Sequence, residues 1–231
     1  MTARLDKVRR FWDSKAAENP YWYVSSYGPY RERDLDEFWR SGERIWLDLK
    51  QSIGYHPAND HAVAEIGCGV GRLTRAIAAD VGTIHAFDIS AQMLEHARSL
   101  GLENAVFYHT SGSSLAPVPD GSIDCALAYC VFQHLPNLEV LGQYLYEMIR
   151  VIRKGGIIAF TLEQRTPADS FQLVLRLRRR IIELIRPSGP TELYRREWVG
   201  IRPKPRAVVA RCPVSVGHSN FHGKWLFSGR A

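Results

Sequence analysis

Residues 64–72, which read Ala-Glu-Ile-Gly-Cys-Gly-Val-Gly-Arg, place three glycines where they could hold a nucleotide-like ligand. Gly67, Gly69 and Gly71 alternate with other residues, and glycine lets a backbone approach a ligand closely. Asp88 follows 17 positions after Gly71. A carboxylate at the end of the next strand can accept hydrogen bonds from the hydroxyls of a ribose. The pattern therefore predicts a site for a nucleotide or nucleoside.

The spacing of the glycines separates the classes of nucleotide site. A dinucleotide fingerprint, G-x-G-x-x-G/A, needs a small third residue where this sequence has Arg72. The phosphate-loop pattern G-x-x-x-x-G-K-[ST] is also absent. The spacing therefore fits neither the dinucleotide class nor the phosphate-loop class. The alternative is a glycine-rich turn in an ordinary α/β protein.

Alternating strands and helices are expected to position this loop. Apolar runs predict strands near residues 62–66, 83–88, 105–109, 123–130 and 156–162. Helical periodicity predicts helices near residues 71–80, 91–100 and 137–152. Ser90 suits the N-cap of the second of these helices. Such alternation is typical of an α/β protein with a parallel, doubly wound sheet.

The segment before the first strand is rich in aromatic residues. Apolar side chains recur there at helical spacing, at Leu5, Val8, Phe11 and Trp12. Asn19-Pro20 is predicted to end this helix, and an aromatic loop and a second helix near residues 35–53 follow. The first 50 residues hold ten of the 25 aromatic residues. We expect a helical cap over the ligand-binding edge of the sheet.

The chain fits one domain of 231 residues with four parts. These parts are an aromatic helical cap (1–55), a ligand-binding core (56–163), a basic helical insertion or lid (164–211) and a terminal strand pair (212–231). Within the insertion, helices are predicted near residues 169–185 and 205–211. Extended segments near 214–218 and 224–228, joined by residues 219–223, are predicted to form a hairpin.

Composition restricts the class of protein. The sequence is 45% hydrophobic and 23% charged, which are globular values, and no apolar run approaches the ~20 residues of a membrane helix. The N-terminus has no apolar signal core, and the four cysteines have no C-x-x-C spacing. We therefore expect a cytoplasmic protein without a metal site. The net charge of +6 raises nucleic acid as a partner without establishing it.

Two motifs carry a resemblance to a known family. The sequence E-x-G-x-G-x-G, followed by Asp88, resembles motif I and its acidic partner in class I S-adenosylmethionine (SAM) methyltransferases. Residues 119–124, Pro-Asp-Gly-Ser-Ile-Asp, resemble the P-D-x-S-F-D sequence that precedes the fourth strand in that family. The resemblance is clear over residues 58–163. It extends more loosely to the terminal strand pair. It implies SAM as cofactor and a mostly parallel seven-stranded sheet whose last strand is antiparallel.

The resemblance also implies roles for single residues. The loop from Glu65 to Gly71 would contact the methionine part of SAM, with Cys68 as a small filler rather than a nucleophile. Asp88 would bind the ribose, and Ile89 and Met93 would flank the adenine, although plain helix packing explains Met93 equally well. Where the family often has an Asp near the adenine amine, this sequence has Ser111 and Gly112. Ser111 or a backbone carbonyl would then substitute.

The end of the fourth strand carries the candidate for proton transfer. Tyr129 is expected to border the cofactor crevice, and Gln133 and His134 follow it. Several oxygen methyltransferases have a histidine base near this position, and an imidazole that is neutral near pH 7 can take a proton from a hydroxyl or ammonium. The alternative is that His134 only shapes the loop before the next helix.

Two further segments have two interpretations each. Tyr21, Trp22 and Tyr27, together with Tyr23 and Tyr30, could line an acceptor pocket or surround the sulfonium, or they could pack the cap against the sheet. Residues 165–186 form a basic amphipathic pattern with four arginines at 176 and 178–180. This pattern is typical of a solvated lid face, but an acidic acceptor, RNA or a membrane surface would also fit it.

The sequence predicts methyl transfer from SAM to an oxygen or nitrogen of a small molecule by in-line displacement. One alternative is a methyltransferase of RNA or another nucleic acid. Against it, the fourth strand is not followed by N/D-P-P-Y/F, and Cys130 follows Tyr129 rather than a proline. Another alternative is that the chain is a partner protein that binds SAM without catalysis. Hydride transfer is disfavoured, because Arg150 stands four positions after Tyr146, where a Y-x-x-x-K pair needs lysine.

Overall fold

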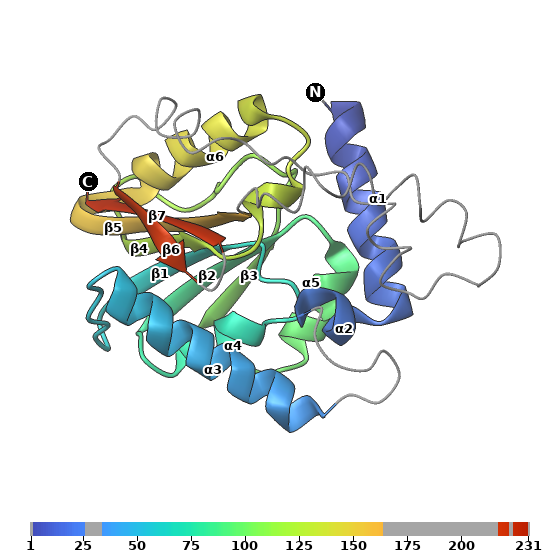
Figure 1. Cartoon of the computed structure of the whole chain (residues 1–231), viewed down its shortest axis with the longest axis horizontal. Helices are drawn as coiled ribbons and strands as arrows, with labels where there is room; N and C mark the ends of the chain where they lie inside the picture. Colours follow the sequence, from blue (N-terminus) through green and yellow to red (C-terminus); the bar gives the residue numbers. More distant parts are fainter. Residues whose placement is uncertain (1, 26–33, 164–216, 222–223, 231) are drawn as a thin grey trace.

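The structure is a computed structural model that describes residues 2–25, 34–163, 217–221 and 224–230 (Figure 1). Its elements, in chain order, are α1 (Thr2–Glu18), α2 (Pro20–Ser25), α3 (Leu35–Ser52), β1 (Ala62–Ile66), α4 (Arg72–Ala78), β2 (Thr83–Asp88), α5 (Ala91–Arg98), β3 (Ala105–His109), β4 (Ile123–Ala128), the 3-10 turn η1 (Phe132–His134), α6 (Leu138–Val151), β5 (Ile152–Glu163), β6 (Gly217–Phe221) and β7 (Lys224–Arg230). The helices predicted within residues 164–211 lie outside the described residues.

The described strands form one sheet in the order β3-β2-β1-β4-β5-β7-β6. The first five of these run parallel, β7 is antiparallel to β5, and β6 is antiparallel to β7. The chain moves outward from β1 to β3 and then returns to β4 on the other side of β1. The carboxyl ends of β1 and β4 therefore meet at a topological switch point, where open α/β sheets bind ligands. The predicted doubly wound, mostly parallel α/β class is confirmed.

Helices cover both faces of the sheet, as a buried parallel sheet requires. Alternate residues of a strand point to opposite faces. Ala64 of β1 accordingly lies in a cluster with Leu145 and Met148 of α6, whereas Val63 lies in another with Trp46 of α3 and residues of α4. Figure 1 shows α6 on one side of the sheet and α3 and α4 on the other. Since α3 covers a face of the sheet, it does not belong to a cap over the edge, contrary to the expectation.

The motif at residues 119–124 fixes how β4 begins. Ser122 Oγ donates to the carbonyl of Pro119 (2.7 Å), and Gly121 adopts φ +62° in the turn. One residue into β4, the buried Asp124 accepts a hydrogen bond at Oδ2 from the backbone N–H of Ala62 (2.8 Å). This bond ties the starts of β1 and β4 together. The motif therefore has the structural role that the sequence predicted for it.

The described part of the aromatic segment after α1, residues 20–25, is a helix rather than the predicted loop. Asn19 and Pro20 do end α1, but they also begin α2, because proline suits the first position of a helix and asparagine suits its N-cap. The Asn19 side chain accepts a hydrogen bond from the backbone N–H of Trp22 (3.2 Å). α1 packs against α5 beyond the strand ends, next to α2 (Figure 1).

Some strand limits also differ from the prediction. β4 ends at Ala128, whereas the sequence predicted a strand to residue 130. Cys130 adopts φ +60°, which is not a strand conformation. β5 begins earlier than predicted, because Ile152 already pairs with Ile123. In the terminal hairpin, β6 includes residues 219–221, which were predicted to belong to the turn, whereas residues 214–216 lie outside the described residues. Pairing with a neighbouring strand sets these limits, and the local sequence does not show it.

Candidate functional site

The glycine loop after β1 has a backbone conformation that favours glycine. Gly67, Gly69 and Gly71 have φ values of +71°, +56° and +85°, in the left-handed region that favours glycine. A Cβ on Gly67 would lie 2.3 Å from a methyl carbon of Val131, which follows β4. The backbone N–H groups of Gly67 and Cys68 donate to the carbonyl of Phe87 in β2 (2.7 and 2.9 Å). The loop is thus held between the ends of β2 and β4.

Asp88, the last residue of β2, reaches the glycine loop. Its Oδ2 accepts a hydrogen bond from the backbone N–H of Gly69, and its Oδ1 accepts one from that of Ser90, both at 2.8 Å. The side chain is buried, and this burial raises the pKa of Asp88 to about 6. The carboxylate is therefore ionised near pH 7. Because each carboxylate oxygen has two lone pairs, it can accept further hydrogen bonds from a ligand.

Glu65 lies within the sheet rather than in the open loop. It is buried in β1, and its Oε2 accepts a hydrogen bond from Thr74 Oγ1 of α4 (2.6 Å). Burial raises the pKa of Glu65 to about 7, although the bond from Thr74 opposes this rise. The side chain thus joins β1 to α4 beneath the glycines. A contact with the methionine part of SAM remains a prediction.

The residues predicted to flank adenine lie near one another. A Cβ on Gly112 would come within 2.8 Å of a methyl carbon of Ile89 and within 2.9 Å of one of Leu5 in α1. Met93 is buried in a cluster with Val70 of the glycine loop, so its packing role is evident. Ser111 is exposed. The loops after β2 and β3 therefore meet, as a common binding edge requires.

Cys68 and Tyr129 occupy apolar surroundings. Cys68 is buried with Ala86 and Leu94, and this burial raises the pKa of its thiol well above the ordinary value. Such a thiol is a poor nucleophile near pH 7, which agrees with a filler role. Tyr129 is partly buried and packs against the cluster that covers the α3 and α4 face of the sheet.

The segment after β4 places His134 and Gln133 on one short turn. Cys130, at φ +60°, donates its backbone N–H to Thr161 Oγ1 of β5 (2.8 Å), and η1 follows. Gln133 is buried, and its amide oxygen has no hydrogen-bond partner among the described residues. The imidazole of His134 stands edge-to-face with the ring of Trp12, with 5.0 Å between the ring centroids.

Helix α1 makes contacts with the site that sequence reasoning missed. Ser90 Oγ donates a hydrogen bond to Oδ1 of Asp13 (2.7 Å), across 77 residues of sequence. Trp12, one residue earlier, reaches His134. Leu5 lies against the position of Gly112. These contacts connect α1 to the loops after three strands, and no local pattern could have indicated them.

The predicted acceptor-binding aromatics have the contacts of packing residues. Tyr21 stands edge-to-face with Phe38 and Trp39 of α3, at centroid distances of 5.3 and 6.2 Å. Trp22 is buried and stands edge-to-face with Tyr23 at 4.8 Å. Tyr27 lies outside the described residues. The packing interpretation therefore describes Tyr21 and Trp22, and a role in an acceptor pocket stays a prediction.

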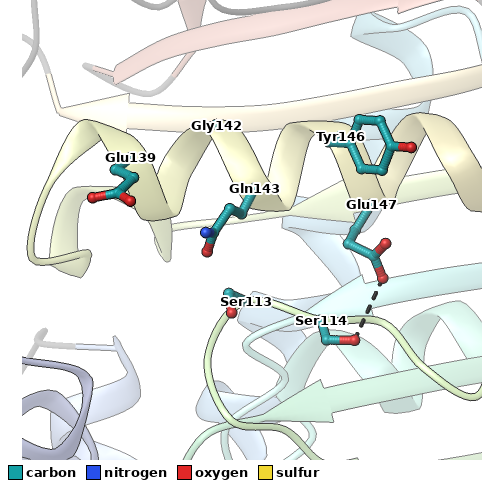
Figure 2. Close-up of a pocket in the computed structure, with 7 residues that line it drawn as sticks. All are labelled: Ser113, Ser114, Glu139, Gly142, Gln143, Tyr146 and Glu147. Carbon is teal, nitrogen blue, oxygen red and sulfur yellow. Dashed lines mark hydrogen bonds between the residues drawn. The ribbon is translucent and has the colours of Figure 1, made fainter. Parts of the chain in front are cut away.

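A pocket of about 480 Å³ lies between α6 and the loop after β3. Figure 2 shows the residues that line it. Polar side chains from both sides line it, namely Ser113, Ser114, Glu139, Gln143 and Glu147 together with Gly142 and Tyr146. Glu147 Oε2 accepts hydrogen bonds from Ser114 Oγ (3.5 Å) and from the backbone N–H of Leu115 (2.9 Å). Arg150 forms an ion pair with Glu147 at 2.8 Å. This carboxylate therefore holds the loop to α6, and no sequence signal pointed to the pocket.

The residues of the site fit SAM, the cofactor that the resemblance implies. The glycines allow close approach, and the buried Asp88 carboxylate supplies acceptors for two hydroxyls. Within the described residues, no group of three or more His, Cys, Asp or Glu side chains is placed to hold a metal ion. No helix in the same part of the chain is both long enough and apolar enough to span a bilayer.

Comparison with known proteins identifies the central domain. Residues 64–160 match the family model described as a methyltransferase domain. Methyltransferase GfsG of Streptomyces halstedii is 32% identical over 54% of this chain, a match that covers 45% of GfsG. The ubiquinone biosynthesis O-methyltransferase of Xanthomonas oryzae is 28% identical over 61% of this chain and 65% of its own length. The match to GfsG thus spans less than half of that relative.

Solved structures share the fold at low sequence identity. The complex of DhpI with S-adenosylhomocysteine (SAH) is 17% identical, with a TM-score of 0.62 over 97% of this chain and 95% of that one. Phosphoethanolamine N-methyltransferase 1 of Haemonchus contortus is also 17% identical, with a TM-score of 0.58 over 71% of this chain and 33% of that one. Residues 64–160 thus match the methyltransferase domain family, and the solved structures show the same fold over a larger part of the chain.

Proposed function

We propose that the chain transfers the methyl group of SAM to an oxygen or nitrogen of a small-molecule acceptor and releases SAH. The observation that carries this proposal is the buried carboxylate of Asp88 hydrogen-bonded to the glycine loop at the switch point of the sheet. When bound, SAM supplies a methyl group that its sulfonium activates. The new carbon–oxygen or carbon–nitrogen bond forms as the carbon–sulfur bond breaks.

The first task of the chain's own residues is to hold SAM and to orient it toward the acceptor. In this proposal Asp88 accepts hydrogen bonds from the ribose, Ile89 and Gly112 border the adenine, and the glycine loop lies against the methionine part. Orientation of two reactants supplies effective molarities on the order of 10⁵–10⁸ M. Most of the acceleration of a methyl transfer can therefore come from positioning.

The second task is removal of a proton from the acceptor, which we assign to His134. It lies on η1, directly after the strand that borders the switch point. A positioned base contributes on the order of 10²–10⁴-fold, when the acceptor must lose its proton early. Gln133 is proposed to accept a hydrogen bond from the acceptor, because its buried amide oxygen has no partner among the described residues.

The names of the relatives support a small molecule as the acceptor. One named relative is a ubiquinone biosynthesis O-methyltransferase, and another methylates 2-methyl-6-phytyl-1,4-hydroquinone by its name. We propose an acceptor of that general kind, with an ionisable hydroxyl or amine. Helices α1 and α2, together with residues 164–211, are proposed to choose it, because the family match leaves those residues out.

Replacement of His134 by alanine tests the assignment of the base. Acceptors are first screened by SAH release, and the rate is then measured for His134→Ala and for His56→Ala, a matched control at an exposed histidine. We expect His134→Ala to lose about 10²–10⁴-fold in kcat with SAM affinity intact, and the control to keep the wild-type rate. A loss below tenfold with intact SAM affinity would exclude an essential base at this position.

A further inference from the structure

We propose that Trp12 is a positioning residue for His134, and that the Asp13–Ser90 hydrogen bond holds α1 in the place from which Trp12 does this. The inference rests on the proposed function of His134. It adds a role for α1, a helix that precedes the matched methyltransferase residues 64–160.

Contact between the two rings is the first observation. The indole of Trp12 and the imidazole of His134 are nearly perpendicular, at 89°, with centroids 5.0 Å apart. Edge-to-face aromatic pairs at such distances are favourable beyond the apolar area that they bury. Trp12 also packs against the cluster that contains Val70 of the glycine loop and Met93. One side chain therefore borders both the predicted cofactor residues and the proposed base.

The attachment of α1 is the second observation. Asp13 accepts a hydrogen bond from Ser90 Oγ (2.7 Å), and Ser90 also donates its backbone N–H to Asp88 (2.8 Å). The α1 helix is thus fixed, one residue away from Trp12, to the loop that directly follows Asp88, the residue proposed to bind the ribose. Leu5, two turns earlier on α1, packs in the main core cluster. These contacts fix the position and rotation of the helix.

Orientation of the His134 side chain is separate from the position of its backbone, which η1 fixes. The backbone N–H of His134 donates to the carbonyl of Val131 (2.9 Å), and this bond acts on the backbone rather than on the side-chain torsions. The second torsion of histidine is broad, without three sharp wells. A base must lie within hydrogen-bond reach of the proton that it takes, and a displacement of about 1 Å can reduce a rate about 10²-fold. An edge-to-face neighbour restricts that torsion.

The test compares Trp12→Ala and Trp12→Phe with Trp46→Phe. Trp46 is a suitable control because it is buried in the opposite core, where its indole N–H donates to Asp80 (2.8 Å). For each variant of the full chain, NMR records the ring signals of His134, assigned by their loss in His134→Ala. Calorimetry gives SAM affinity, urea unfolding gives stability, and the acceptor assay gives kcat and KM.

We expect Trp12→Ala to shift the ring signals of His134 by more than the loss of the indole ring current accounts for, and to lower kcat about 10–100-fold, with SAM affinity changed less than threefold. Trp12→Phe should recover most of kcat, because phenylalanine preserves an edge-to-face contact. Trp46→Phe should lose stability but keep the His134 signals and kcat. Unchanged His134 signals in Trp12→Ala, or an equal loss of kcat in the Trp46→Phe control, would overturn the inference. If His134→Ala stays active while the signals shift, the base assignment fails and the positioning contact stands.

Discussion

Replacement of Gly67 by alanine should destabilise the chain through two separable effects. Gly67 has φ +71°, and an L-residue in the left-handed region costs about 1–2 kcal/mol. The added Cβ would also lie 2.3 and 2.8 Å from the two methyl carbons of Val131. Overpacking of this kind costs about 1–3 kcal/mol. We therefore expect the free energy of unfolding to fall by about 2–5 kcal/mol.

Two matched variants separate these effects. Gly121 has φ +62°, and no atom lies within 4 Å of an added Cβ. Gly121→Ala therefore measures only the free-energy cost of placing an L-residue in the left-handed region, about 1–2 kcal/mol. Val131→Ala removes both methyl carbons that the Cβ of Gly67→Ala would meet. The double variant of Gly67 and Val131 should then be more stable than the sum of the single changes predicts, by about 1–3 kcal/mol.

Urea unfolding at 25 °C, analysed by linear extrapolation, measures all four free energies, including that of the double variant. A fall in the free energy of unfolding that is no larger for Gly67→Ala than for Gly121→Ala would refute the packing effect. It is also refuted if the changes at Gly67 and Val131 are additive, because the packing of the glycine loop against the segment after β4 would then have no energetic role.

Three further predictions concern the site and its support. Asp88→Asn should weaken SAM binding about 10–100-fold in calorimetry, since a hydrogen bond to a charged group contributes about 1.5–3 kcal/mol; unchanged affinity would remove Asp88 from the site. Burial raises the pKa of Glu65 from 4.5 to about 7, so its stabilising contribution is complete below about pH 4.5 and is lost as pH rises through 7. Glu65→Gln should therefore reduce the fall in stability between pH 4.5 and 7 in urea unfolding, and an unaltered pH dependence would show that Glu65 is not the titrating group. Asn19→Ala should lower stability by about 1 kcal/mol through loss of the α2 cap, and an unaffected unfolding midpoint would contradict that capping role.

Local patterns predicted the parts of the site that local chemistry determines. The left-handed glycines and the position of Asp88 follow from residue types within a single strand-loop-helix-strand unit. Ser90 was predicted as a helix cap, and it accepts a hydrogen bond from the backbone N–H of Met93 (3.1 Å). Its second role, the bond to Asp13, depends on how α1 packs. Sequence spacing carries no signal for such a contact.

Sequence reasoning missed two further features, the start of α2 and the contact between α1 and His134. Asn19-Pro20 was predicted only as the end of a helix, although the same residues also begin α2. The contact between Trp12 and His134 joins residues far apart in sequence, and only the docking of α1 brings them together. The part of the chain that is proposed to choose the acceptor was also the part with the fewest local patterns to interpret.

Calorimetric titration of the full chain with SAH tests the central claim most directly, since it requires no acceptor. We predict saturable binding of SAH at one site per chain. The affinity for SAH should be reduced about 10–100-fold in Asp88→Asn and unchanged in His56→Ala. Absence of saturable binding of SAH, confirmed with SAM, would contradict the assignment of the glycine loop and Asp88 as the cofactor site.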